Sequence, residues 1–174
     1  SSYSEIIFDD VSIPKEYRLD IKISGRELIK KILDISCIGL SAEILGIIME
    51  SFELTINYLK EREQFGVKIG SFQSLQHRAA KLFSEIELCK SIVLKALQAI
   101  DKENTDLSYY ASLAKAKLCK TAKLMTNEAI QMHGGIGVTD DSNIGFYLKK
   151  ARVVQKIFGD YNFHLDKLAK IKGY

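Results

Sequence analysis

The sequence predicts an all-α protein, an up-and-down four-helix bundle with a short N-terminal extended segment. Apolar residues recur at spacings of three and four over most of the 174 residues, which is the period of one face of an α-helix. Pro14 is the single proline in the chain, and proline is rare inside helices because it lacks the backbone N–H. Hydrophobic residues make up 47% of the sequence, which is enough for a folded core in one domain.

Residues 1–20 are expected to form the extended segment, and residues 21–174 the helical bundle. Apolar residues from Ile6 to Ile13 alternate loosely around an Asp-Asp pair, and Pro14 ends the run, as in a single strand followed by a turn. A single strand leaves its own backbone groups unpaired. We therefore expect this segment to pair with strands outside the chain or to lie over the helices as an arm.

The helices are separated by glycine pairs and polar turns. Gly66 and Gly70 follow the first helix, and Ser71 is a plausible N-cap for the second. A polar turn at 104–106 precedes the third helix, and the run 134–137 ends it. The expected helices run from about Glu27 to Arg62, Ser71 to Lys102, Leu107 to His133, Ile144 to Phe158 and Tyr161 to Lys172.

Charge and cysteine usage exclude several classes of protein. The net charge is +3, with 25 basic and 22 acidic residues interspersed along the helices, so the sequence holds no basic block of the kind that binds nucleic acid. The three cysteines are widely spaced on apolar helical faces, which predicts buried reduced thiols, no metal site and a reducing compartment such as the cytoplasm. These cysteines are Cys37, Cys89 and Cys119.

The apolar stretch Ile32–Met49 is interrupted by Asp34 and Glu43. It is therefore expected to be a buried helix rather than a membrane span. The sequence predicts no signal peptide.

Two short stretches carry candidate binding residues. In Arg62-Glu63-Gln64-Phe65-Gly66, an arginine at a helix end can direct two N–H donors at a phosphate, and an aromatic ring can stack on a planar base. In the stretch from Gln131 to Gly137, glycines allow the backbone to approach a pyrophosphate. Taken singly, the first stretch is also compatible with an ordinary helix end bearing a solvated arginine, and the second with a glycine C-cap.

Together, these stretches resemble the acyl-CoA dehydrogenase family, in its C-terminal helical domain. The match has a characteristic order and spacing and runs over nearly the whole chain. It comprises Tyr58, Arg62-x-Gln64-Phe65-Gly66, Phe72-Gln73, Gln76-His77, Gln131-x-x-Gly134-Gly135-x-Gly137 and Ala151-Arg152, while Phe8–Pro14 resembles the last strand of the family's middle β domain.

The resemblance implies contacts to FAD, which in this family lies in a cleft between domains and across a subunit interface. It assigns Arg62 to the flavin pyrophosphate of a neighbouring subunit and Phe65 to the adenine. The cofactor would accept hydrogen bonds from the glutamines Gln64, Gln73 and Gln131 or donate hydrogen bonds to them. The main chain at Gly134 and Gly135 would contact the adenosine side of the cofactor.

The sequence departs from the family pattern at the catalytic base. The family glutamate usually stands in Ala-Arg-x-x-Gln-x-x-Glu-Gly-Thr, and Phe158 occupies its position here. Some members carry the base on the long first helix instead, but the corresponding positions fall near Ser36 and Cys37, which are not acidic. Asp160, two residues after Phe158, is the remaining candidate for a base that removes a substrate proton.

The leading hypothesis is the C-terminal domain of an FAD-dependent enzyme that dehydrogenates acyl-CoA thioesters at the α,β bond. The isolated chain is expected to be inactive, because the family's first two domains are absent. The alternatives are a non-catalytic partner subunit of a heteromeric acyl-CoA dehydrogenase and a plain assembly module. In each case we expect a homodimer or homotetramer, with an alanine-rich face of the third helix admitting a helix of another chain. That face carries Ala111, Ala114, Ala122 and Ala129.

Overall fold

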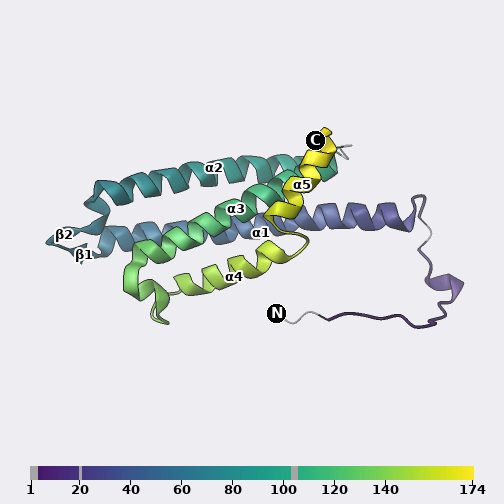
Figure 1. Ribbon diagram of the computed structural model, residues 1–174, viewed down its shortest axis with the longest axis horizontal. Coiled ribbons are helices and arrows are strands. Elements are labelled where there is room, and N and C mark those ends of the chain that lie inside the picture. The colour runs from purple at the N-terminus through teal and green to yellow at the C-terminus, as the bar shows by residue number, and fades with distance from the viewer. Residues whose placement is uncertain (1–3, 20, 103–105) are drawn as a thin grey trace.

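The computed structural model describes residues 4–19, 21–102 and 106–174, and it confirms the all-α fold (Figure 1). Asn104 and Thr105 of the expected polar turn lie outside the described residues. The helices are α1 (Gly25–Glu61), α2 (Gln73–Asp101), α3 (Leu107–His133), α4 (Ile144–Lys156) and α5 (Tyr161–Lys172). The short elements are the 3₁₀ turns η1 (Lys15–Tyr17), η2 (Ile69–Ser71) and η3 (Gly134–Val138) and the strands β1 (Glu63–Gln64) and β2 (Val67–Lys68).

Helices α1 to α4 run alternately up and down, and α3 packs against all of α1, α2, α4 and α5 (Figure 1). The main core lies between these helices and contains Ile48 of α1, Ile86 of α2, Leu118 of α3 and Val154 of α4. Burial of such aliphatic side chains is the main term that stabilises the bundle.

Helix α1 begins with a capping box that the sequence analysis did not identify. The Ser24 hydroxyl accepts a hydrogen bond from the backbone N–H of Glu27, and the Glu27 carboxylate accepts one from the backbone N–H of Ser24. The helix therefore starts two residues before the predicted Glu27. It ends at Glu61, with Arg62 as its C-cap.

Two expectations about helix ends are wrong. Ser71 is not the N-cap of α2, because its hydroxyl donates to the carbonyl of Lys68 and the helix starts after Phe72. Helix α4 ends at Lys156 rather than Phe158, because Phe158 and Gly159 have φ values of 58° and 98°, which no right-handed helix contains.

The alanine-rich face of α3 does not admit a helix of another chain. Its four alanines are fully buried inside the bundle and pack in cores that include residues of α1 and α2, such as Ile38 and Ala96. That expectation of the sequence analysis is wrong, because helices of the same chain already occupy the face.

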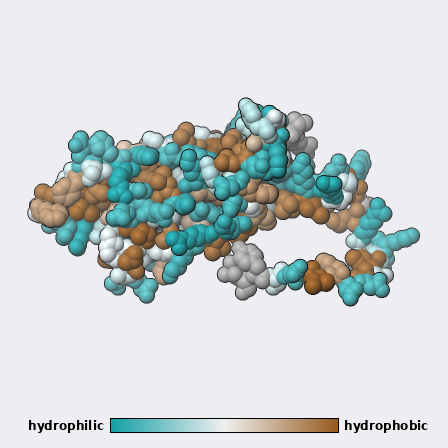
Figure 2. All heavy atoms as spheres, viewed as in Figure 1, coloured by the Kyte–Doolittle hydropathy of each residue, from teal (hydrophilic) through white to brown (hydrophobic). Residues whose placement is uncertain are grey.

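The described N-terminal residues 4–19 lie away from the bundle, exposed, with only the η1 turn as regular structure (Figure 1). The first part of α1 also projects beyond the other helices and exposes apolar side chains, visible as brown surface in Figure 2. By length and apolarity, α1 is the one helix among the described residues that could cross a membrane, and 44% of its most apolar window is buried in the bundle.

Candidate cofactor-contact site

The first candidate stretch forms a tight hairpin between α1 and α2. The Arg62 backbone N–H donates to the Tyr58 carbonyl at 2.9 Å and ends the helix. Strands β1 and β2 then pair antiparallel, with Gln64 opposite Val67. The sequence analysis expected a helix end here but not a hairpin, although Phe-Gly between two short polar segments is the signal that could have indicated one.

The hairpin turn presents an aromatic ring to solvent. Phe65 and Gly66 both have positive φ, 56° and 77°, as in the two-residue type I′ turn. This conformation suits glycine but is unfavourable for phenylalanine. The Phe65 side chain is 93% exposed, and its described ring contact is an edge-to-face one with Phe72 at 6.2 Å between centroids. A strained and solvated phenylalanine does little for stability.

Polar residues precede and follow Phe65 in the sequence. Arg62 and Gln64 are exposed, and no ion pair found among the described residues involves the Arg62 guanidinium. Gln73 is exposed at the first position of α2. The Gln76 side chain donates to the Gly70 carbonyl at 2.9 Å, which ties the hairpin connection to the start of α2.

The second candidate stretch lies at the end of α3, at the same end of the bundle as the hairpin (Figure 1). Gln131, Gly134 and Gly135 are exposed, and a methyl group added at either glycine would meet no atom within 4 Å. Gly134 caps the helix with φ of 65°. The open main chain at these glycines leaves room for a ligand to approach the backbone closely.

A ring pair links the two stretches. His133 at the end of α3 is buried and stacks on Tyr58 near the end of α1, with 4.5 Å between ring centroids. The His133 ring nitrogen Nδ1 lies 2.7 Å from the Ala129 carbonyl oxygen. The stack fixes the ends of α1 and α3 relative to each other, although no described hydrogen bond joins the hairpin directly to Gln131, Gly134 or Gly135.

A cavity of about 280 Å³ opens beside the ring pair. Its walls include Glu61, Asp141 and Asn143 in addition to Tyr58 and His133, and none of the seven predicted cofactor residues lines it. Each of those seven residues is instead exposed.

The exposed residues offer groups that could hold the adenosine diphosphate end of FAD. Arg62 offers a cation for the pyrophosphate, Phe65 offers a ring that is already exposed for stacking, and Gly134 and Gly135 leave their backbone open. An exposed surface of this kind is suited to a cofactor that another domain or chain holds from the opposite side.

Phe158, which the resemblance aligns with the family base, and Asp160 lie in the turn between α4 and α5. Phe158 is 43% exposed. The Asp160 carboxylate lies 2.7 Å from Lys156 Nζ and accepts a hydrogen bond from the Phe163 backbone N–H, so it caps α5. The hydrogen bond from Lys156 lowers the pKa of Asp160, which makes the carboxylate a weaker base. These contacts favour a capping role for Asp160 over proton abstraction.

Behind this turn lies a buried polar cluster that the sequence analysis missed. Lys115 of α3 is fully buried, and its ammonium group donates to the carbonyls of Val154, Gln155 and Gly159 at 3.0–3.2 Å. His164 of α5 is also buried, with Nε2 at 3.0 Å from the Phe158 carbonyl oxygen. The available signal was the position of Lys115, which falls on the apolar stripe of α3.

The three cysteines are buried and free, as expected, and burial raises the pKa of each thiol. Among the described residues, no group of three or more histidine, cysteine, aspartate or glutamate side chains is placed to hold a metal ion.

Comparison with known proteins agrees with the motifs. The family model "Acyl-CoA dehydrogenase, C-terminal domain" matches residues 24–172. The short/branched chain specific acyl-CoA dehydrogenase of Bos taurus mitochondria is 30% identical over 170 residues, which cover 98% of this chain and 39% of that protein. The caffeyl-CoA reductase-Etf complex subunit CarC of Acetobacterium woodii is 30% identical over 150 residues, covering 86% of this chain and 39% of the relative.

The fold is also that of a solved relative. Butyryl-CoA dehydrogenase from Megasphaera elsdenii superposes with a TM-score of 0.88 at 27% identity, over 95% of this chain and 43% of that one. The chain thus spans about two fifths of the length of the relatives it matches. With the motifs, the fold and these relatives in agreement, the chain belongs to the acyl-CoA dehydrogenase family and corresponds to its C-terminal helical domain.

Proposed function

We propose that this chain supplies the adenosine-end FAD contacts and the assembly contacts of an acyl-CoA dehydrogenase-like flavoprotein that oxidises acyl-CoA thioesters at the α,β bond. When bound, FAD would supply the acceptor for the hydride. The chain's own residues would bind and orient the cofactor, and the base that removes the α-proton would come from outside the chain.

The observation that carries this proposal is the exposed Phe65 ring at a positive φ. The strain and the exposure both oppose stability, so a ligand that stacks on the ring is the simplest reason to keep it. Arg62 lies on the same hairpin, where its guanidinium can reach a phosphate as the ring meets the adenine.

The location of the base outside the chain is supported by the α4–α5 turn. A phenylalanine occupies the position of the family glutamate, and the nearby Asp160 is held by Lys156 and by the α5 backbone. A general base needs a carboxylate or similar group that is free to take a proton. Phe158 offers none, and Asp160 is already engaged.

A second candidate function is a non-catalytic subunit of a heteromeric acyl-CoA dehydrogenase. Retained cofactor residues beside Phe158 favour this arrangement, and the name of the CarC relative describes it as a subunit of a complex with Etf. In that case, a second acyl-CoA dehydrogenase-like chain would contribute the base and the acyl-CoA pocket.

The test is flavin absorbance after gel filtration of the purified protein with excess FAD, with mass determined by light scattering. Arg62→Ala is compared with Arg26→Ala, an exposed arginine at the start of α1. Yellow protein that elutes as a dimer or larger, and that loses its flavin only in Arg62→Ala, supports the cofactor role. Colourless protein that still oligomerises, and that stays colourless with a full-length relative, identifies an assembly module instead.

A further inference from the structure

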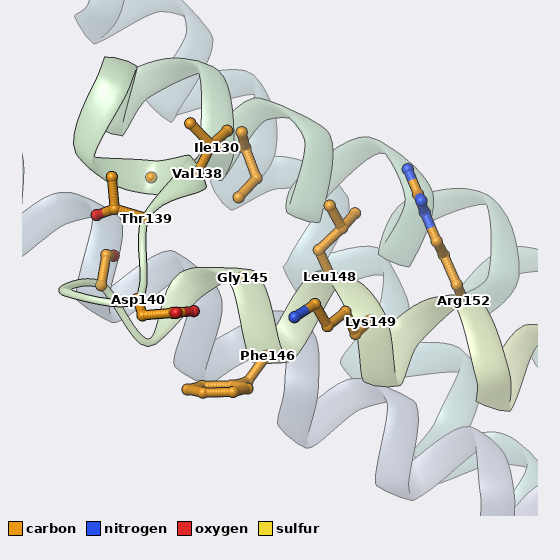
Figure 3. A pocket seen from close by; sticks show the side chains of 11 residues that line it. Ile130, Val138, Thr139, Asp140, Gly145, Phe146, Leu148, Lys149 and Arg152 are labelled. Carbon is orange, nitrogen blue, oxygen red and sulfur yellow. The ribbon is translucent and has the colours of Figure 1, made fainter. Parts of the chain in front are cut away.

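A groove with a strongly basic lining runs between α3 and α4. It consists of three adjoining cavities of about 240, 390 and 380 Å³. The first and second share Leu148 and Arg152, and the second and third share Lys123 and Lys156. Figure 3 shows the first of these cavities, between the end of α3 and the start of α4.

Five cationic side chains line this α3–α4 groove, and all five residues are exposed. On each helix they follow spacings of three or four, which places them on one face. Helices α3 and α4 run antiparallel (Figure 1), and cations from both helices line the second and third cavities together. The five residues are Lys120 and Lys123 of α3 and Lys149, Arg152 and Lys156 of α4.

The other faces of the same two helices have their charges neutralised. Toward α2, Lys117 of α3 pairs with Glu85, and toward α1, Lys150 of α4 pairs with Glu43 at 2.8 Å. Within the part of the chain that the structure describes, Lys156 is the only groove cation in an ion pair, with Asp160. The unneutralised charge is therefore concentrated on the face that α3 and α4 present together.

The groove has a defined length. Its two carboxylates lie at opposite ends, Asp140 in the first cavity and Asp160 in the third. Figure 3 shows Lys149 pointing toward Asp140 and Arg152 reaching toward α3. Helix α4 has 13 residues, about 20 Å at 1.5 Å per residue, and an extended peptide of about six residues spans that distance.

We propose that the α3–α4 groove binds a short acidic segment of another polypeptide in an extended conformation. Carboxylates of the segment would meet the two rows of cations, while its aliphatic stems lie against Ile130 and Leu148 in the floor of the first cavity.

Two other anions fit the groove less well. A nucleic acid would continue past both ends, where Asp140 repels its phosphates and Asp160 already occupies Lys156. A site for a single nucleotide would have its cations clustered around one cavity, whereas the cations of this groove are spread over three.

The test uses a fluorescein-labelled hexaglutamate peptide and measures anisotropy at low and physiological salt. The groove variant Lys123→Glu/Arg152→Glu is compared with Lys31→Glu/Lys81→Glu, two exposed lysines outside the groove whose exchange changes the net charge equally. We expect saturable, salt-sensitive binding that weakens about tenfold or more in the groove variant and less than twofold in the control. Thermal unfolding of each variant establishes that it is folded.

Several results would overturn the proposal. Binding of hexaglutamate that does not saturate, or that weakens equally in both variants, would indicate attraction by net charge alone. Displacement of the labelled peptide by ATP or by a ten-residue oligothymidylate, at concentrations far below those that unlabelled hexaglutamate requires, would identify a nucleotide or nucleic-acid site. The groove variant keeps Arg62 and Phe65, so a failure here leaves the proposed cofactor role intact.

Discussion

The ammonium group of Lys115 lies 3.0 Å from the carbonyl oxygen of Gly159 and also donates to Val154 and Gln155. A fully buried lysine thus satisfies the last carbonyls of α4 and fixes the turn that leads into α5. The same turn carries Phe158, which the resemblance aligns with the family glutamate.

Substitution of Lys115 by methionine is expected to lower the free energy of unfolding by roughly 2–3 kcal/mol, because one buried and two partly buried carbonyls lose their donor. Lys120→Met, an exposed position on the same helix, is expected to change it by less than about 0.5 kcal/mol. Urea denaturation followed by circular dichroism measures both. Equal midpoints for the two variants would show that the buried cap does not stabilise the turn.

His164 is expected to make stability fall in acid. Burial lowers the pKa of His164 from 6.5 to about 4, helped by the nearby positive charges of Lys115 and Lys167 and opposed by Asp34 and the Phe158 carbonyl. The unfolded imidazole takes up its proton below pH 6.5, while the folded one stays neutral until about pH 4. The contribution of the neutral His164 to the free energy of unfolding is therefore complete above pH 6.5. It is lost as the pH falls to 4, and the loss amounts to at most about 3 kcal/mol.

The measurement is the urea midpoint as a function of pH between 7 and 4 for wild type, His164→Gln and the exposed control His77→Gln. Carboxylates such as Glu85, whose pKa is lowered by Lys117, contribute in all three proteins. Only His164→Gln is expected to show a shallower decline. A decline as steep as that of wild type would place the acid sensitivity elsewhere.

Phe65→Asn is expected to raise stability and weaken FAD binding together. Asn-Gly is a favoured pair for a type I′ turn, so the free energy of unfolding should rise by roughly 0.5–1 kcal/mol as the strain at φ 56° is relieved. The variant has no aromatic ring to stack on adenine. Phe146→Asn, an exposed phenylalanine within α4, is the control and should leave FAD binding unchanged. A stabilised variant with undiminished flavin binding would remove Phe65 from the cofactor site.

Two glycines near the end of α3 are expected to differ sharply in tolerance. A methyl group at Gly137 would lie 2.9 Å from both His133 Cβ and the Ile130 carbonyl oxygen, so Gly137→Ala should destabilise the fold by about 1–3 kcal/mol. Gly135→Ala meets open space and should change stability by less than about 0.5 kcal/mol. Thermal unfolding distinguishes the two, and similar melting temperatures would contradict the close packing at Gly137.

The sequence by itself determined the fold class, the number and order of the helices and the family. The helical period of 3.6 residues is a local pattern that can be recognised in the sequence without knowledge of tertiary contacts. Helices α3 and α5 accordingly begin and end at the predicted residues. The cofactor motifs were likewise readable as residue types at fixed spacing.

Only the tertiary structure decided what depends on neighbours distant in sequence. The turn at Phe65 can be recognised only from its backbone φ. The role of Lys115 can be recognised only from its hydrogen bonds to carbonyls about 40 residues away. The alanine-rich face of α3 is interior, because α1 and α2 pack against it. Charges that appear evenly interspersed along the sequence gather between α3 and α4, because antiparallel packing brings two separate helical faces together.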